Sequence, residues 1–207
     1  MWQLGLLVVL GSTNAAPLSA NDVLKRSQKA YDSARTLIED VRGSTGSFSG
    51  TAHIVFQRPG QLKVSGASLG GRPYALLVTG GKTWVLSVGQ WQQSQSPEMG
   101  IAAITGISAN AGTSVPAALF HAKWGGILTM PGAGAPSLTK QTIAGRSTYV
   151  VHRKASNGGT AMDSTMWFDS KTFFLVQTSM KIMGRDLIVK FDAPKINVAV
   201  PKNAFTR

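Results

Sequence analysis

The 207-residue sequence contains no cysteine. This absence excludes disulfide bonds, thiolate nucleophiles, cysteine-ligated zinc and the lipid-attachment cysteine of a membrane-anchored lipoprotein. Acidic residues are also few, since 9 Asp and Glu stand against 21 Lys and Arg, and the formal net charge is +12. This excess favours an acidic partner such as nucleic acid, an anionic lipid surface or an acidic protein, although solubilising surface charge is its commonest meaning.

Long hydrophobic runs are missing near the start of the chain, where only the short run Leu4–Leu10 occurs. That run is far too short to cross a bilayer as a helix. Small residues at Thr13 and Ala15, followed by Pro17, resemble a signal-peptidase site, although no Lys or Arg precedes the run. We expect residues 1–15 to be a signal peptide for export to the periplasm and residues 16–207 to form one domain, with a buried N-terminal strand as the alternative.

The region Ser19–Arg42 has the periodicity of a surface helix. Its apolar residues recur at spacings of three and four from Val23 to Val41. Ser19 is the predicted N-cap, and Asp22 places an acid in the first turn.

From Ser47 onward the apolar period changes to two, and turn residues such as Pro59-Gly60 and Gly80-Gly81 separate the alternating segments. Successive hairpins of this kind predict an antiparallel meander of about nine strands. The expected strands cover or include Phe48–Phe56, Leu62–Ser65, Tyr74–Val78, Trp84–Val88, Trp91, Leu138–Ile143, Thr148–Lys154, Met162–Phe168, Phe173–Ile182 and Leu187–Phe191.

The segment Ser96–Pro136 interrupts the strands and is rich in Gly and Ala, with almost no charge. We expect two short helices and loops here. A long apolar insertion of this kind suits a cover over an apolar surface better than a plain linker.

No motif in the sequence predicts an enzyme. Gly66–Gly70 matches the letters G-x-S-x-G around Ser68, but a nucleophile elbow needs a following helix, and here a strand follows. Gly80–Thr83 resembles the end of a phosphate-binding loop and fails for the same reason. The histidines His53, His121 and His152 are dispersed. We therefore expect no catalytic residue, metal or cofactor.

Aromatic residues are concentrated in the strands and in the expected cover: Phe48, Phe56, Tyr74, Trp84, Trp91, Phe120, Trp124 and Trp167. They are either ordinary core residues or the lining of a concave sheet face that its own side chains cannot fill. In the second case helices or a ligand's acyl chains must exclude water from that face.

Several short motifs, in this order, resemble the outer-membrane lipoprotein carrier superfamily, the LolA/LolB-like proteins. The stretch Phe56–Val64 (FQRPGQLKV) is similar to the family's RPG-x-[FL]-[RK] turn, and Leu77–Val85 (LVTGGKTWV) is similar to its DGKTLW hairpin, with Gly80 in place of the usual aspartate. Met166–Thr172 (MWFDSKT) and Asn197–Thr206 resemble its closing motifs. The likeness spans about Asn21 to Thr206 and is nearest to a predicted periplasmic branch.

The resemblance implies an α+β fold, namely an incomplete antiparallel β-barrel with an N-terminal helix and with short helices over its concave face. It implies a periplasmic role in outer-membrane biogenesis, the transport or binding of lipids or lipoprotein acyl chains. In the carriers an arginine of the RP turn tethers the helical lid, and Arg58 holds that position here.

The expected ligand-binding residues combine this resemblance with the apolar pattern: Phe48, Phe56, Arg58, Leu62, Tyr74, Leu76, Trp84, Trp91, Leu119, Phe120 and Trp124. An inner-membrane transporter and an anionic membrane surface are further candidate partners of a monomeric protein that binds no nucleic acid. The alternative is a protein-interaction or stress-sensor module of the cell envelope on the same fold, without ligand transport.

Overall fold

A computed structural model describes residues 17–207, apart from residues 69, 106, 109, 123–127, 129–134, 158–159 and 183. The predicted signal peptide, residues 1–15, lies outside the described residues. Within the described ranges, no helix combines the length and the apolar character that a membrane crossing requires.

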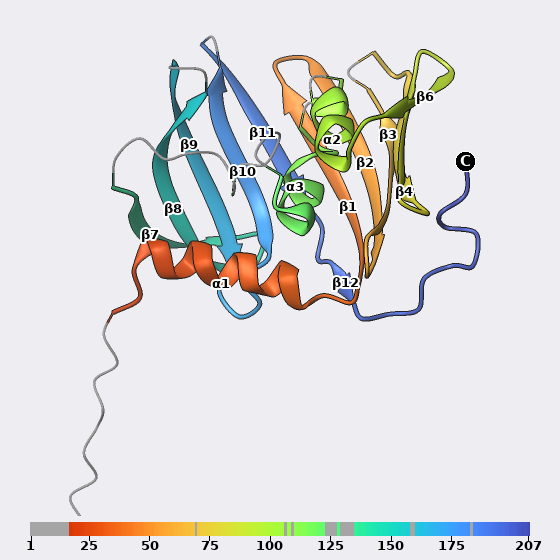
Figure 1. The fold of residues 1–207 in the computed structure, drawn as a ribbon. Coiled ribbons are helices and arrows are strands. Elements are labelled where there is room, and N and C mark those ends of the chain that lie inside the picture. Colours follow the sequence, from red (N-terminus) through yellow and green to blue (C-terminus); the bar gives the residue numbers. More distant parts are fainter. Residues whose placement is uncertain are drawn as a thin grey trace, which may run out of the picture.

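The chain forms an antiparallel succession of strands, and the helices lie on one side of the sheet that these strands build (Figure 1). The helices are α1 (Ala20–Ser33), α2 (Pro97–Thr105) and α3 (Ser114–Phe120). The strands are β1 (Thr36–Thr45), β2 (Phe48–Gln57), β3 (Gln61–Ala67), β4 (Pro73–Thr79), β5 (Lys82–Ser87), β6 (Gln90–Ser94), β7 (Ser137–Ile143), β8 (Arg146–Asn157), β9 (Thr160–Asp169), β10 (Leu175–Ile182), β11 (Arg185–Phe191) and β12 (Lys195–Ile196).

All strands belong to one antiparallel, curved sheet in the order β6-β5-β4-β3-β2-β1-β11-β10-β9-β8-β7, with β12 added beside β1. The pairing of β1 with β11 joins the N-terminal and C-terminal halves of the meander. Because β6 and β7 do not pair, the sheet stays open at two edges. The predicted α+β fold with an incomplete antiparallel barrel is confirmed.

The predicted helix over Ser19–Arg42 is wrong in its second half. The capping box between Ser19 and Asp22 is present, but the helix ends at Ser33. Beyond it, β1 alternates buried residues, among them Leu37 and Val41, with half-buried or exposed neighbours, and it pairs with β2 along its whole length. This segment fits both periods by composition, and the backbone hydrogen bonds offered by β2 decide in favour of a strand.

The core lies between the helices and one face of the sheet, which we call the inner face. Helices α1, α2 and α3 all contribute to a single apolar cluster with inner-face residues such as Leu37, Ile54, Leu76 and Phe168. The opposite face, the outer face, carries the alternate residues of each strand. The two short helices expected within Ser96–Pro136 are therefore found, and they cover the inner face as predicted (Figure 1).

Candidate functional site

The candidate site is the interface between the inner face and the helical cover, by which we mean α2 and α3. Helix α2 contacts β4, β5 and β6, and α3 contacts α1 and α2. Ile101 and Ile104 of α2 and Leu76 of β4 are fully buried in the shared core. Because this surface is apolar on both sides, its burial drives the closed arrangement.

Glycines let the cover approach the sheet closely. A Cβ atom at Gly50 of β2 would lie 2.8 Å from the backbone oxygen of Ser108, and one at Gly112 would lie 2.8 Å from the hydroxyl oxygen of Tyr74. A Cβ at Gly100 of α2 would lie 2.6 Å from Leu76 Cδ1. The cover is thus seated on the described inner face at close-packed distances.

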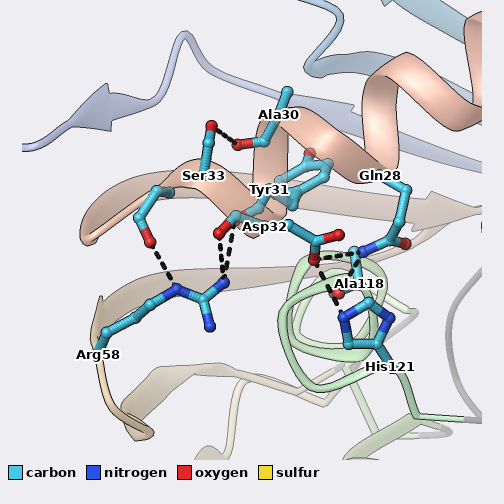
Figure 2. A network of polar contacts seen from close by, with 9 residues as sticks. Gln28, Ala30, Tyr31, Asp32, Ser33, Arg58, Ala118 and His121 are labelled. Carbon is cyan, nitrogen blue, oxygen red and sulfur yellow. Dashed lines mark hydrogen bonds and ion pairs between the residues drawn. The ribbon is translucent and has the colours of Figure 1, made fainter.

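Arg58 joins the β2–β3 turn to the end of α1 (Figure 2). Its Nε donates to the carbonyl oxygen of Ala34 at 3.0 Å, and its Nη2 donates to that of Asp32 at 2.8 Å. The last turn of α1 contains no basic residue of its own. The guanidinium therefore supplies the donors and the positive charge that a helix C-terminus favours.

Helix α1 is in turn linked to α3 by polar side chains (Figure 2). Gln28 Nε2 donates to the carbonyl oxygen of Ala118 at 2.9 Å and also to Asp32 Oδ1. His121 Nε2 lies 3.0 Å from the same Asp32 oxygen. We call Gln28, Asp32, Arg58 and His121 the latch, because together they connect the sheet, α1 and the cover.

One buried carboxyl group lies on the inner face of the sheet. Glu39 points to the inner face from β1, is 2% exposed, and has no hydrogen-bond partner for either oxygen. Burial raises the pKa of the Glu39 carboxyl well above its ordinary value, and the nearby Asp192 and Asp40 raise it further. Both effects disfavour the charged form of this carboxyl group.

The structure gathers most of the predicted site residues at the interface. Phe56, Leu62, Tyr74, Leu76 and Leu119 all belong to the buried core. Phe120 packs against that core, and its ring meets the Phe56 ring edge-on at a centroid distance of 6.1 Å. Arg58 lies at one end of the interface, where it contacts α1 rather than the expected segment Ser96–Pro136.

The remaining predicted residues lie elsewhere. Trp84 pairs with Leu77 and alternates with the inner-face residue Val85, so its side chain is on the outer face, and Trp91 lies on that face beside Leu86. The expectation that these two tryptophans face the cover is corrected, because strand parity places them on the other side. Phe48 is 51% exposed beside the β1–β2 turn. Trp124 lies outside the described residues.

The C-terminal segment covers the outer face near Trp84. The Arg207 guanidinium lies 3.8 Å from the centre of the Trp84 ring, and Lys63 Nζ donates to the carbonyl oxygen of Thr206 at 2.6 Å. Leu77, between Lys63 and Trp84 in the same cross-strand row, is 1% exposed. Trp84 thus serves to pack the tail on the sheet.

A shallow groove of about 350 Å³ also opens on the outer face, lined by β1, β2 and β3. Its polar wall includes Asp40 and His53, whose side chains lie 2.7 Å apart. The groove is separated from the helical cover by the sheet.

The motifs that resemble catalytic loops form turns. Ser68 Oγ accepts a hydrogen bond from the Arg72 backbone at 3.1 Å and closes the β3–β4 turn, so a strand follows it and not a helix. Gly80 and Gly81 form the β4–β5 turn with positive φ angles. Within the residues that the structure describes, no cluster of three potential metal ligands occurs.

The sequence analysis missed most of the latch and Glu39. Gln28, Asp32 and His121 carry no motif, since nothing in the sequence says which helix meets which. The position of Glu39 could have been detected from the sequence. If this segment is assigned as a strand, Glu39 lies between Leu37 and Val41 on the apolar side of the alternation.

The sequence matches no protein-family model and no curated protein. Among solved structures, LprF from Mycobacterium bovis has a TM-score of 0.54 at 16% identity, over 89% of this chain and 97% of LprF. The lipoprotein LppX from Mycobacterium tuberculosis has a TM-score of 0.51 at 14% identity, over 88% of this chain and 97% of LppX. MucB has a TM-score of 0.54 at 11% identity, over 91% of this chain and 62% of MucB. The complex of MucA and MucB from Pseudomonas aeruginosa also matches, with a TM-score of 0.51. These likenesses show the fold, and they confirm the sequence resemblance at that level.

Proposed function

With its LolA-like fold as the premise, we propose that this protein binds lipids or the acyl chains of lipoproteins between its inner face and its helical cover. The ligand would occupy the apolar surface that α2 and α3 now cover. A periplasmic carrier of such molecules, exported through a signal peptide at residues 1–15 and folded over residues 16–207, is the specific form of the proposal.

The observation that carries the proposal is the chemistry of the cover. Ile101, Ile104 and Leu119 present apolar side chains to the sheet, and an acyl chain could replace them without leaving polar groups unpaired. Burial of a ligand's apolar surface is worth about 25 cal/mol per Å², before the cost of ordering the chain. Displacing one apolar occupant by another therefore needs little net free energy.

The latch supports the same function because it is made of contacts that break and re-form easily. The Asp32 and His121 side chains are 40% and 64% exposed, so water replaces their ion pair when the helices move. The residues proposed to contact ligand are Phe56, Leu62, Tyr74, Leu76, Leu119 and Phe120, with Arg58 holding α1 in the closed state.

A reversible disulfide bond between the cover and the sheet tests this proposal. A Cβ at Gly100 would lie 2.8 Å from Thr83 Cγ2, which places the two Cβ positions within about 4.3 Å, the range that a disulfide spans. Because the chain has no cysteine, Thr83→Cys with Gly100→Cys would create a single bridge that fastens α2 to β5.

Binding of a fluorescent diacylglycerol would be measured for the wild type and for the locked protein, and native mass spectrometry would detect co-purified lipid. We expect the oxidised double variant to lose probe binding and the reduced form to regain it. Thr83→Cys alone serves as the control and should bind the probe equally under oxidising and reducing conditions, because it adds no atom at the tightly packed Gly100. Equal binding by the oxidised and reduced forms would exclude this interface as the ligand site.

A second candidate is a protein-interaction or stress-sensor module of the envelope. It is supported by the close seating of the cover at Gly50 and Gly112 and by the fold likeness to MucB, which has been solved with MucA. Under this hypothesis the interior is a permanent core. The wild type would then bind no lipid probe and would carry no lipid in native mass spectrometry, in either redox state of the locked variant.

A further inference from the structure

We propose that Glu39, together with Ser27, forms an interior polar site that binds a hydrogen-bond-donating, non-anionic head group of the ligand. The chemical class is an amphiphile that ends in an amine or a hydroxyl. This inference rests on the proposed function, because it names the polar end of a molecule whose apolar part occupies the interface.

The two side chains face the same buried layer from opposite sides. Glu39 lies on the inner face of β1, and Ser27 lies on the buried face of α1, one helical turn before Tyr31. The Glu39 carboxyl is close enough to Tyr31 to act on its hydroxyl electrostatically. Helix α1 thus places Tyr31 near the acid.

Both groups are left without partners in the closed state. Neither carboxyl oxygen of Glu39 nor the Ser27 hydroxyl oxygen has a hydrogen-bond partner, and Ser27 is fully buried. The Tyr31 hydroxyl oxygen accepts a hydrogen bond from the Leu175 backbone N–H at 3.4 Å. Buried polar groups without partners are rare because they forfeit their hydrogen bonds to water, so an unpartnered pair indicates a partner supplied from outside the chain.

The local charges select the kind of partner. The charged groups that act on Glu39 are Asp192 and Asp40, both of them acids. A carboxylate or phosphate head group would be repelled here, whereas an N–H or O–H donor would find acceptors that nothing else uses. This preference is opposite to that of the protein as a whole, whose net charge of +12 attracts anions.

The test compares ligands of one chain length: dodecylamine, dodecan-1-ol, dodecyl methyl ether and dodecanoate, each below its micelle concentration. Their affinities are measured by displacement of the fluorescent diacylglycerol from the wild type, Glu39→Leu and Glu39→Gln. Asp186→Asn is the matched control, because Asp186 is an exposed acid of β11 and is not among the charged groups that act on Glu39.

We expect the wild type to bind the amine and the alcohol about tenfold more tightly than the ether or dodecanoate, the factor that ~1.4 kcal/mol produces in an equilibrium constant. Glu39→Leu should bind the alcohol and the ether equally, whereas Asp186→Asn should keep the wild-type order. Glu39→Gln, which retains an acceptor without the acid, should keep the preference for the alcohol over the ether.

Two results would overturn the inference. If all four ligands displace the probe equally from the wild type, or if Glu39→Leu keeps the order, then Glu39 is not the head-group site although the interface still binds acyl chains. If the diacylglycerol binds to none of the proteins, the proposed function itself fails, and the head-group site fails with it.

Discussion

The two ends of the helical cover are held by different kinds of contact. At one end α2 lies on β4 and β5 through apolar side chains, with Gly100 pressed against Leu76 and Thr83. At the other end α3 also packs into the core through Val115 and Leu119, but it is in addition tied to α1 by Gln28 and Asp32, which are polar and partly exposed. Apolar close packing is costly to open because it leaves a cavity, whereas exposed polar links exchange with water at little cost. The comparison predicts that α2 sets the stability of the closed state and that the latch sets how often it opens.

The largest effect is expected from Leu76→Ala, which leaves a cavity where α2 packs on β4 and β5. Leu76 is fully buried between β4 and α2, and such truncations cost about 2–5 kcal/mol in the free energy of unfolding. Urea denaturation would measure the loss. Leu86→Ala, on the half-buried outer face of β5, is the control, and an equal cost for both variants would contradict the distinction between the faces.

Glu39→Leu tests the buried polar group on the inner face and should stabilise the protein. Because burial and the nearby acids raise the folded-state pKa of the Glu39 carboxyl, the native state binds more protons than the unfolded state. Wild-type stability therefore falls as the pH rises above about 4.3, the ordinary pKa of glutamate.

The gain from Glu39→Leu should consequently grow as the pH rises above about 4.3, and reach about 1–3 kcal/mol, the cost of an unsatisfied buried polar group. Urea denaturation at several pH values would measure it. A gain that does not change with pH would show that Glu39 is not protonated in the folded protein.

Gly50→Ala tests how tightly the cover is seated. The added methyl group would lie 2.8 Å from the Ser108 backbone oxygen, and the backbone can yield only if the α2–α3 connection moves. Overpacking of this kind costs about 1–3 kcal/mol. Gly70→Ala, which meets no atom within 4 Å, should change the unfolding free energy by less than about 0.5 kcal/mol.

Arg58→Met should open the polar end without unfolding the sheet. Loss of the hydrogen bonds to Asp32 and Ala34 is worth about 1 kcal/mol, or about a fivefold rise in the open population. In a chain without cysteine, Leu119→Cys supplies a single buried thiol whose labelling rate reports that opening. Arg72→Met is the control, and Arg58→Lys should restore little, because an ammonium cannot reproduce the fork of a guanidinium.

The smallest effect is expected from Asp32→Asn, which weakens the link to His121. An exposed contact of this kind, which is an ion pair when His121 is protonated, contributes about 0.2–1 kcal/mol, and its electrostatic part is screened by salt. The same thiol-labelling assay should show a rise smaller than that of Arg58→Met, and the rise should disappear at about 1 M salt. A rise that persists at high salt would point to the hydrogen bond from Gln28 instead.

The strands could be predicted from the sequence because their alternation repeats over many residues. From Phe48 to Phe191 the predicted strands correspond to strands of the structure, and the helices of the cover fall within the predicted segment Ser96–Pro136. The failure at Thr36–Thr45 has a physical cause. Leu37, Ile38 and Val41 satisfy the helical and the strand periods alike, and only the partner strands β2 and β11 separate the two.

The site could be predicted only in part, for a related reason. The inner-face residues Phe56, Leu62 and Leu76 follow from alternation, but the same rule applied to β5 shows only that Trp84 and Val85 face opposite sides. Which side receives the cover depends on contacts between segments far apart in the chain.

The amino-acid sequence by itself determined an antiparallel meander with an apolar, nearly uncharged insertion, because periodicity and turn residues act over short stretches of backbone. Tertiary structure alone decided that the tail would cover Trp84, that Arg58 would hold the end of α1, and that Glu39 would be enclosed without a partner. Each of these three features depends on burial and on contacts with residues far away in the chain, and a local sequence pattern carries no information about either of them.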